Sequence, residues 1–328
     1  MALPTFTPTF PNQQLGTGDE LALAIEQFTG IVEGTIERKS KAAPFVNVRT
    51  VRGTTTIVND AIGESTLQVV TPGSTPDGTS ENQTSRVSLT IDTLVLARTN
   101  IPLLDTFQKN WDFKSEVGRE HGKKIAKFYD EAFFIQAAKA AASSGSAYGA
   151  LPGHAGGSTT TLANAADAND PAALLAAISD LFVKMENKDV DPGTDDVIVA
   201  LRPAAFYALL DADQIVNGEY ITSRGTKLEG VKMLKALGVP VVSSNNVPNS
   251  NITGHLLSNT RNGNAYDGDF TKLVAVAFAP NALLAGETIS LTSAVWYSEE
   301  KKTWFVDAHL AFGVTVNRAE YAGRIILP

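Results

Sequence analysis

The chain has 328 residues, of which 43% are hydrophobic, a composition typical of a globular protein long enough for two domains. It holds 35 acidic and 27 basic residues and no cysteine, which excludes disulfides, thiolate metal sites and a cysteine nucleophile and argues against binding nucleic acid by charge. The opening MALPTFTPTFPNQQ lacks a signal-peptide pattern and no run approaches eighteen apolar residues, so we expect neither secretion nor a membrane span.

The first forty residues predict an arm followed by a short amphipathic helix. About fifteen polar, proline-rich residues favour an extended segment that orders only against another surface. Asp19 is a candidate N-cap, and helical spacing continues until Pro44, through Leu21, Ile25, Phe28, Val32 and Ile36.

From Phe45 the hydrophobic period changes to two, which predicts strands over 44–58 and 86–99. Residues 71–85 between them, TPGSTPDGTSENQTS, have nothing to bury, so the pair forms a hairpin with a polar tip. Two interpretations stay open. The hairpin projects and is stabilised on another copy of the chain, or it packs on its own body with a flexible tip.

The stretch from Trp111 to Ser144 predicts one helix, roughly 45 Å long at about 1.5 Å per residue. An apolar stripe contains Phe113, Val117, Ile125, Phe128, Ala132 and Ile135. The other faces carry charge, at Arg119, Glu120, Lys123, Lys124, Lys127, Asp130 and Glu131. A helix of this length is a scaffold for neighbouring elements.

Beyond the helix, the glycine/serine-rich residues 143–161 predict a linker at a domain boundary. The next segments alternate between helices at 171–186 and 204–212 and strands at 195–203, 238–248 and 272–280, which indicates a mixed α/β layer. Residues 287–327 are strand-rich, with a turn at Glu299–Lys302, and we expect them to return to the long helix.

A search for catalytic, cofactor and metal sites yields none. The histidines at 121, 154, 255 and 309 share no ligand spacing, and Gly225–Lys232 departs from a phosphate loop. Gly145–Gly149 has the wrong spacing for a nucleophile elbow, and a turn before a strand accounts for Asp191, Asp195 and Asp196. We therefore expect a protein that is not an enzyme.

Charge along the long helix admits two interpretations. Arg119, Lys123 and Lys127 recur every four residues, while Asp77 and Glu81 give the hairpin tip the opposite sign. The basic line is either a solvated face or a surface that meets acidic groups of a neighbouring copy, where complementarity would set register more than affinity. The candidates for subunit-interface residues are Arg49, Arg52, Asp77, Glu81, Arg86, Arg119, Lys123 and Lys127.

The order of these parts resembles the major capsid proteins of tailed bacteriophages, the Hong Kong 97 fold. The local sequences that carry the resemblance, closest to podovirus-like short-tailed phages, are GDELALAIEQFTGIVEGTIERKS, SLTIDTLVLARTNIPLLD, EVGREHGKKIAKFYDEAFF, DDVIVALRPAAFYALLDAD and MLKALGVPVVSSNNVP. The implied fold is α+β, with an N-arm at 1–44, an extended β-hairpin E-loop at 45–99, a P domain with the spine helix at 100–170, an A domain at 171–286 and returning P-domain strands at 287–328.

The resemblance also implies a function: self-assembly, through pentamers and hexamers, into an icosahedral virion shell that encloses double-stranded DNA without sequence-specific contact. It implies a separate scaffolding protein, a portal protein and assembly in the host bacterial cytoplasm, leaves room for a cement or decoration protein, and involves no cofactor. An encapsulin-like cellular compartment is the alternative, and an α/β enzyme is a distant third, because the chain shows no convergent acid, base and nucleophile.

Overall fold

The computed structural model describes residues 40–65, 67–75, 83–104, 113–210 and 233–328, which form two compact units. Unit 1 takes most of its described residues from Leu94–Phe128 and Ile289–Ala311. Unit 2 consists of Lys41–Thr93, Tyr129–Thr288 and Phe312–Pro328. The predicted N-arm helix and the acidic hairpin tip lie outside the described residues, as does the glycine-bearing segment 225–232.

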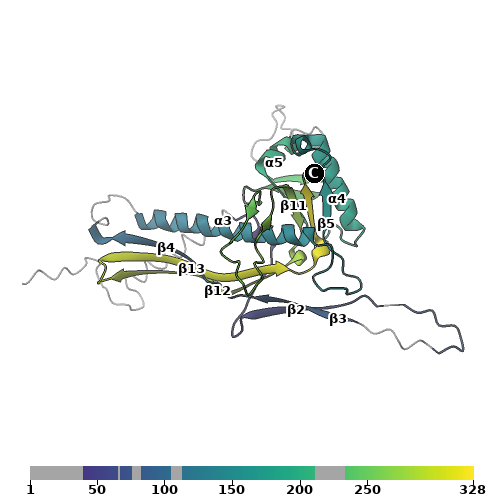
Figure 1. Ribbon diagram of the computed structural model, residues 1–328, viewed down its shortest axis with the longest axis horizontal. Helices are drawn as coiled ribbons and strands as arrows, with labels where there is room; N and C mark the ends of the chain where they lie inside the picture. Colours follow the sequence, from purple (N-terminus) through teal and green to yellow (C-terminus); the bar gives the residue numbers. More distant parts are fainter. Residues whose placement is uncertain (1–39, 66, 76–82, 105–112, 211–232) are drawn as a thin grey trace, which may run out of the picture. The chain divides into compact units, whose positions relative to one another are not determined.

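In unit 1, three strands accompany the first half of the long helix (Figure 1). The helix is α3 (Phe113–Ala142), and the strands are β4 (Val95–Pro102), β12 (Leu283–Ser298) and β13 (Thr303–Val316). β13 lies between β12 and β4 and is antiparallel to β4. Residues 299–302 form the predicted turn between β12 and β13.

The first half of α3 is amphipathic, as its spacing predicts. Val117 and Ile125 are buried, whereas Arg119, Lys123 and Lys127 are exposed.

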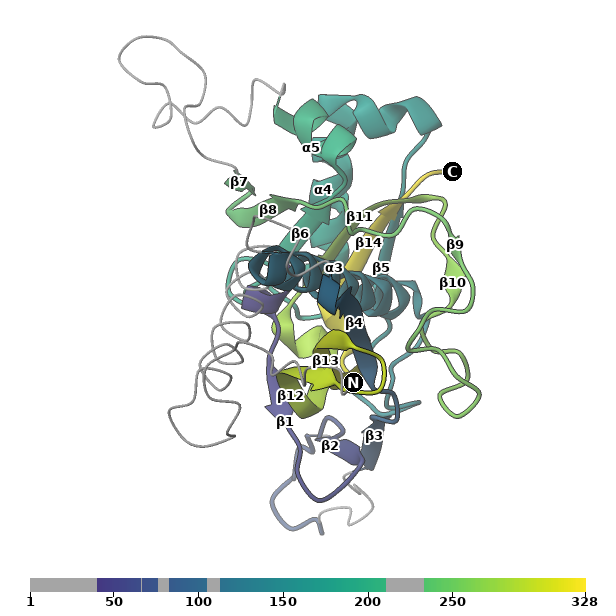
Figure 2. The same ribbon diagram turned by 90° about the vertical axis from the view of Figure 1, so that its left-hand side faces the viewer.

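The main sheet of unit 2 has the strand order β5-β14-β11-β6-β8-β7 (Figure 2). The strands are β5 (Ser158–Thr161), β6 (Ile198–Leu201), β7 (Met233–Ala236), β8 (Val239–Ser243), β11 (Leu273–Phe278) and β14 (Ala322–Ile326). Two helices, α4 (Pro171–Glu186) and α5 (Pro203–Leu210), share a hydrophobic core with the sheet. The sequence correctly predicts the α/β alternation, including Pro171 in the first turn of α4.

Shorter elements complete the described chain. They are η1 (Ala43–Phe45), β1 (Val48–Thr50), β2 (Thr56–Ile62), β3 (Thr84–Thr90), η2 (Ala165–Asn169), β9 (Asn251–Ile252), β10 (Gly268–Asp269), η4 (Pro280–Ala282) and η5 (Ala319–Tyr321).

The second half of α3 departs from the single-stripe prediction. Residues 132–138 are all buried, because the helix packs in two directions within unit 2. Phe134 meets Phe278 of β11 edge to face, with ring centroids 6.2 Å apart. Phe133 stacks on Phe312 of β13 with ring centroids 6.5 Å apart, which confirms that the C-terminal strands return to the helix.

Asp130, which the sequence places on a charged face of α3, is fully buried. Its carboxylate accepts hydrogen bonds from the backbone N–H groups of Lys41 and Ala42 (2.9 and 3.1 Å) and from the side-chain amide of Asn246 (3.0 Å). Asp130 does lie on a polar face of the helix, away from the apolar stripe, but another segment of the chain covers that face. The periodicity of a helix cannot reveal that another segment brings donors to its polar face.

Both long strands predicted from the sequence are interrupted. Residues 44–58 divide into β1, which is parallel to β12, and β2, which is antiparallel to β3. Residues 86–99 divide into β3 and β4, and β4 pairs with β13 instead of β2. The alternation of Val87, Leu89 and Ile91 ends before Leu94, where three apolar residues follow one another, but this local change does not reveal which strand β4 pairs with.

The β2–β3 hairpin is docked near its root. Ile57 and Leu89 are buried, and two glycines leave room for them. A Cβ atom added to Gly286 would lie 1.9 Å from Ile57 Cδ1, and one added to Gly313 would lie 3.2 Å from Leu89 Cδ1. Only glycine at 286 therefore permits this close approach, and the root packs on its own body, as the second interpretation holds.

Candidate assembly surfaces

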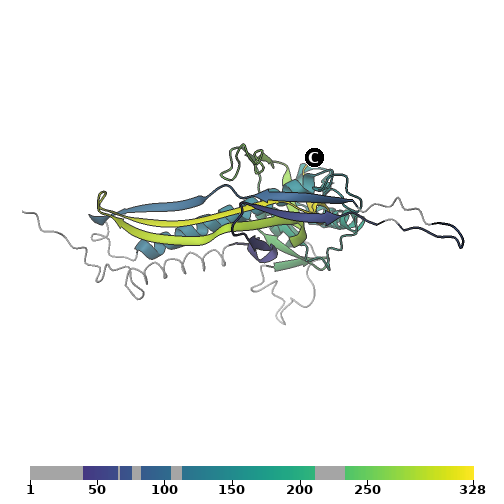
Figure 3. The same ribbon diagram turned by 90° about the horizontal axis from the view of Figure 1, so that it is seen from below.

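Beyond its root, the hairpin exposes apolar side chains that the described residues of the chain do not cover. Ile62 is 65% exposed and Leu67 98%, and Val58, Val69 and Val70 are also exposed. Figure 3 shows β2 and β3 side by side, with the segment that continues from β2. We call residues 62–75, without residue 66, the distal hairpin. Its exposure favours the projecting interpretation for this part.

Arg86, one of the predicted interface residues, forms an ion pair across the hairpin. In the register of β2 and β3 it lies directly opposite Asp60, and its Nε and Nη2 donate to the two carboxylate oxygens at 2.5 and 3.0 Å. The hydrogen bond from Arg86 lowers the pKa of Asp60, and the same bond raises the pKa of Arg86. The pair is exposed, so it neutralises this face of the hairpin more than it stabilises the fold.

A buried polar cluster fixes the hairpin root. Asn59 Nδ2 donates to Tyr148 Oη (2.7 Å) and to Asn317 Oδ1 (2.9 Å), and Tyr148 Oη donates to Asn317 Oδ1 (2.5 Å). Close by in the chain, His154 Nδ1 lies 3.4 Å from a carboxylate oxygen of buried Glu320. Residues 143–161 are thus more than the predicted linker. Sequence reasoning missed this cluster because its members are 89 to 258 positions apart.

The predicted cationic line along α3 is partly neutralised by its own helix. Arg119 Nη1 lies 3.2 Å from Glu116 Oε2, and Lys123 Nζ lies 3.8 Å from Glu120 Oε2. Lys127 is exposed. Binding of these positions to acidic groups of a neighbour stays a prediction, and two of the three cations already have a partner three residues away.

The other predicted interface residues fall in two places. Arg49 on β1 and Arg52 just after it are both exposed. Asp77 and Glu81 lie outside the described residues.

In unit 1, Arg98 of β4 joins a charged and aromatic cluster that the sequence analysis did not select. Its Nε and Nη2 donate to the two carboxylate oxygens of Asp307 on β13 (2.7 and 2.6 Å), and this hydrogen bonding raises the pKa of Arg98. The guanidinium carbon lies 5.1 Å from the ring centre of Trp296 and 5.7 Å from that of Phe305. Pairing between β4 and β13, which the sequence did not reveal, assembles the cluster.

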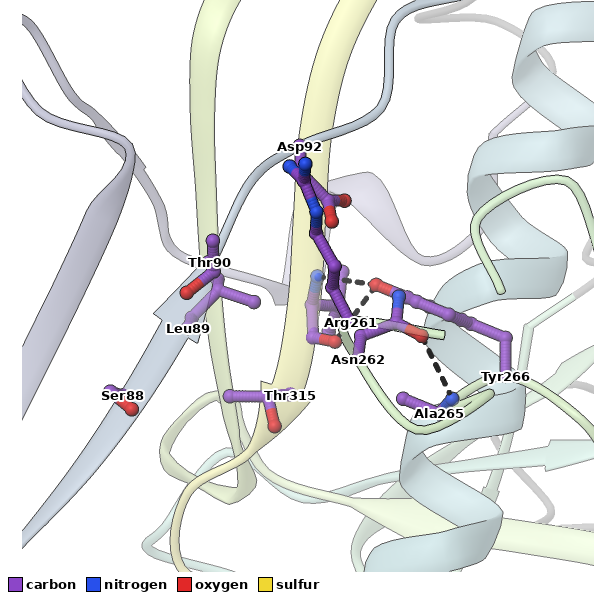
Figure 4. A pocket seen from close by; sticks show the side chains of 10 residues that line it. Ser88, Leu89, Thr90, Asp92, Arg261, Asn262, Ala265, Tyr266 and Thr315 are labelled. Carbon is purple, nitrogen blue, oxygen red and sulfur yellow. Dashed lines mark hydrogen bonds between the residues drawn. The ribbon is translucent and has the colours of Figure 1, made fainter. Parts of the chain in front are cut away.

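The loop between β8 and β11 borders a cavity of about 330 Å³ in unit 2 (Figure 4). Its wall combines β3, the end of β13 and this loop, with Ser88, Leu89, Thr90, Asp92, Arg261, Asn262, Ala265, Tyr266, Val314 and Thr315. Tyr266 Oη donates to the carbonyl of Val314 (2.9 Å) and accepts from its N–H (2.8 Å), so the loop is fastened to β13. Burial raises the pKa of Tyr266 to about 12, which keeps the phenol protonated and able to donate.

The remaining motifs behave as structural elements. Asp191 accepts from Gly193 N (2.9 Å) and Thr194 Oγ1 (2.7 Å), so it caps the turn that precedes β6, as predicted. No group of three or more potential metal ligands gathers in the part of the chain that the structure describes. None of its helices is both long and apolar enough to span a membrane.

Similarity to known proteins identifies the family of this chain. The Gp10A-like family, described as major capsid protein, matches residues 68–287, which include β3, β4, α3 and most of the α/β layer. The chain belongs to this family. As a Gp10A-like major capsid protein it self-associates into a capsid shell, and its place is the virion capsid. No match was found among curated proteins.

Solved capsids share its fold. The capsid structure of the cyanophage P-SCSP1u is 19% identical, covers 86% of each chain and has a TM-score of 0.72. The mature capsid of bacteriophage PhiM1 is 23% identical, covers 86% of this chain and 85% of the other, and has a TM-score of 0.69. These similarities and the family match confirm the α+β class and the predicted Hong Kong 97-type fold of tailed-phage capsid proteins.

The virus-like particle from Pyrococcus furiosus is 9% identical, with 93% of this chain and 99% of the other covered and a TM-score of 0.54. At this identity the similarity concerns the fold alone. Because the family match is to major capsid proteins, the alternative of an encapsulin-like compartment is less favoured.

Proposed function

We propose that copies of this Gp10A-like capsid protein assemble, as pentamers and hexamers, into an icosahedral shell that encloses the double-stranded DNA of a short-tailed phage. The observation that carries the proposal is the distal hairpin. Ile62 and Leu67 expose apolar surface that the described part of the same chain does not cover, and a neighbouring copy would bury it. Isolated two-stranded hairpins are marginal in water, so this contact would stabilise both the hairpin and the shell.

The predicted interface residues belong to this proposal. Arg49, Arg52 and Arg86 lie on or beside the strands that lead into the hairpin, while Arg119, Lys123 and Lys127 lie on the exposed face of α3. Together with Asp77 and Glu81 they would set the register between copies more than the affinity. The five-part division into N-arm, E-loop, P domain, A domain and returning strands also remains a proposal.

Partners and setting follow from the same reasoning. We expect a separate scaffolding protein, a portal protein, and a cement or decoration protein where the mature shell needs further support, with assembly in the host cytoplasm. The net charge of −8 disfavours strong binding to phosphate groups, so contact with the packaged DNA would be weak and independent of sequence. The role is structural, with no catalysis.

The proposal is tested by negative-stain electron microscopy of the purified protein, with and without a candidate scaffolding protein from the same genome. Closed, regular shells would support it. Small oligomers under every condition would contradict it. The particle contents then separate the two shell functions, because DNA supports the phage capsid and an enclosed enzyme supports the compartment.

The hairpin contact has its own test. Deletion of residues 72–84, or the double variant Leu67→Ser with Val69→Ser, should leave folded chains that cannot close shells. Leu256→Ser is the matched control, because Leu256 is 71% exposed but lies in the loop before β11. Normal shells from both hairpin variants would show that the exposed apolar groups are not an assembly contact.

The helix contact is tested by changing Arg119, Lys123 and Lys127 together to glutamate. Like charges three residues apart cost about 0.2–0.5 kcal/mol per pair on a helix, so the fold should survive. Impaired assembly with an unchanged circular dichroism spectrum supports an intersubunit role. Unchanged assembly restores the solvated-face interpretation.

A further inference from the structure

A tight turn at residues 151–154 lies beside the end of strand β2 in unit 2. The N–H of His154 donates to the carbonyl of Leu151 (3.3 Å), which closes the turn. Pro152 is followed by Gly153, whose φ is +77°, and this pair is typical of the two central positions of a type II turn. We call residues 151–154 the latch turn.

The latch turn holds the hairpin where the chain leaves β2. The carbonyl of Pro152 accepts from the N–H of Glu64 (2.9 Å), and His154 Nε2 lies 3.4 Å from the carbonyl oxygen of Ile62, the last residue of β2. A Cβ atom added to Gly153 would lie 2.9 Å from Glu64 Cβ, so the approach requires a glycine. One backbone hydrogen bond and one histidine therefore attach residues 62–64 to the turn.

The imidazole of His154 lies between two acceptors. Its Nδ1 is 3.4 Å from Glu320 Oε1 while its Nε2 faces the carbonyl of Ile62, and the side chains of His154 and Glu320 are only 2% and 5% exposed. A neutral imidazole carries a single N–H, so one ring nitrogen would present a lone pair to an acceptor. One additional proton, on the imidazole or on the carboxyl group, removes this conflict.

The same pair contains two buried polar atoms that form no hydrogen bond within the described residues. They are His154 Nδ1 and Glu320 Oε2. A carboxylate stays charged in a buried site only where donors or cations compensate it. A proton shared between the two side chains supplies this compensation, and the pair then titrates as a unit.

The groups that follow β13 compensate Glu320 only in part. Arg318 Nε lies 3.6 Å from Glu320 Oε1, which is beyond hydrogen-bonding distance, and its guanidinium carbon lies 5.6 Å from the ring centre of Tyr321. On the other side of the imidazole, the ring centre of Tyr148 is 5.2 Å away, and its hydroxyl already donates to Asn317.

Two further charges favour a proton on the pair or leave its titration to the pair itself. Lys188 Nζ donates to the carbonyls of residues 156 and 157 (2.9 and 2.7 Å). Burial lowers the pKa of Lys188, and the negative charge of Glu320 opposes that lowering. From the hairpin, the exposed Glu64 lies beside Gly153, and its carboxylate favours a positive charge on the neighbouring imidazole.

We propose that a proton shared by His154 and Glu320 holds residues 62–64 of the hairpin on the latch turn, and that loss of this proton releases them. Histidine changes its charge between about pH 5 and 8, so the attachment is tight in acid and loosens as the pH rises through the titration of the pair. The buried contacts of Ile57 keep the hairpin root in place in both states. The released segment leads into the distal hairpin, but the inference concerns the isolated chain and stands separately from the proposed shell function.

The test is hydrogen exchange of unassembled chains at about pH 5.5 and about pH 8, read by mass spectrometry and corrected for the intrinsic rate at each pH. Peptides that contain the amide of Glu64 should lose protection by about tenfold or more at the higher pH, since linkage to one proton changes an opening equilibrium by up to about tenfold per pH unit. Peptides from β11 in the core of the sheet serve as the internal reference and should keep their protection.

Two variants should change this protection in opposite directions. Glu320→Gln removes the charge and provides an amide that donates to neutral His154, so Glu64 should stay protected at both pH values. In His154→Gln the neutral amide cannot donate to both acceptors, so protection should be low at both pH values. The control His309→Gln removes a histidine from unit 1 and should keep the wild-type pH dependence.

The wild-type comparison requires no substitution, so it decides the matter even if a variant fails to fold. Equal protection of Glu64 at the two pH values would overturn the proposal. Loss of protection in Glu320→Gln to the level of His154→Gln would also overturn it, because both side chains would then act by packing alone.

Discussion

The buried carboxylate of Asp130 makes a quantitative prediction about stability. Asp130→Ala removes the acceptor for three donors, the backbone N–H groups of Lys41 and Ala42 and the side-chain amide of Asn246. A buried donor left without a partner costs about 1–3 kcal/mol, and Ala42 is fully buried while the surroundings of Lys41 and Asn246 are partly so. We expect a loss of about 3–5 kcal/mol in the free energy of unfolding.

Asp130→Asn should cost less, about 1–2 kcal/mol, because one oxygen still accepts while the new NH₂ group faces donors. The assay is urea unfolding of unassembled chains, followed by near-ultraviolet circular dichroism, together with hydrogen exchange at the amides of Lys41 and Ala42. Glu131→Ala is the matched control, since Glu131 is the neighbouring acid on α3 and is only half-buried. If Asp130→Ala costs no more than Glu131→Ala, the buried network does not hold this segment to the helix.

Three further perturbations test the packing and the electrostatics. Ile125→Asp puts a charge into the buried stripe of α3 and should yield insoluble or unfolded chains, and soluble, assembly-competent protein would show that the stripe is exposed. Gly286→Ala forces a Cβ atom against Ile57 and should lower the free energy of unfolding in urea by about 1–3 kcal/mol. In the control Gly145→Ala the added Cβ atom meets open space, so no such loss is expected. Burial lowers the pKa of His121, so the unfolded chain binds a proton more readily than the folded chain. The free energy of unfolding should therefore fall as the pH drops below about 6.5, and it should fall less steeply in His121→Gln. If the free energies from urea unfolding fall equally with pH in both proteins, this prediction is contradicted.

Much of the secondary structure could be predicted because it follows from local spacing. The helix at 113–142, the turn at 299–302 and the α/β alternation after Pro171 each reflect hydrophobic periodicity or capping within a short window. The order of these elements was also enough to predict the family, and the family match over residues 68–287 confirms that prediction.

The candidate surfaces were less predictable. Exposed basic positions such as Arg119 and Lys123 can be found from helical spacing, but their pairing with Glu116 and Glu120 depends on side-chain conformation. The cavity that Arg261 helps to line is formed by three segments that are distant in sequence, and no pattern within any one of them predicts it.

The sequence by itself determined the elements, their order and the polar character of the hairpin tip, since periodicity, proline and glycine act over a few residues. Only the tertiary structure decided which strands pair and which polar groups are buried. β3 pairs with β2, whereas β4 pairs with β13 from the opposite end of the chain. The burial of Asp130 and the hydrogen bond between Asn59 and Tyr148 each depend on residues at least 88 positions apart. A polar side chain is buried without a large cost only where another segment supplies its hydrogen-bond partners. Those partners come together only when the chain has folded and its layers have packed.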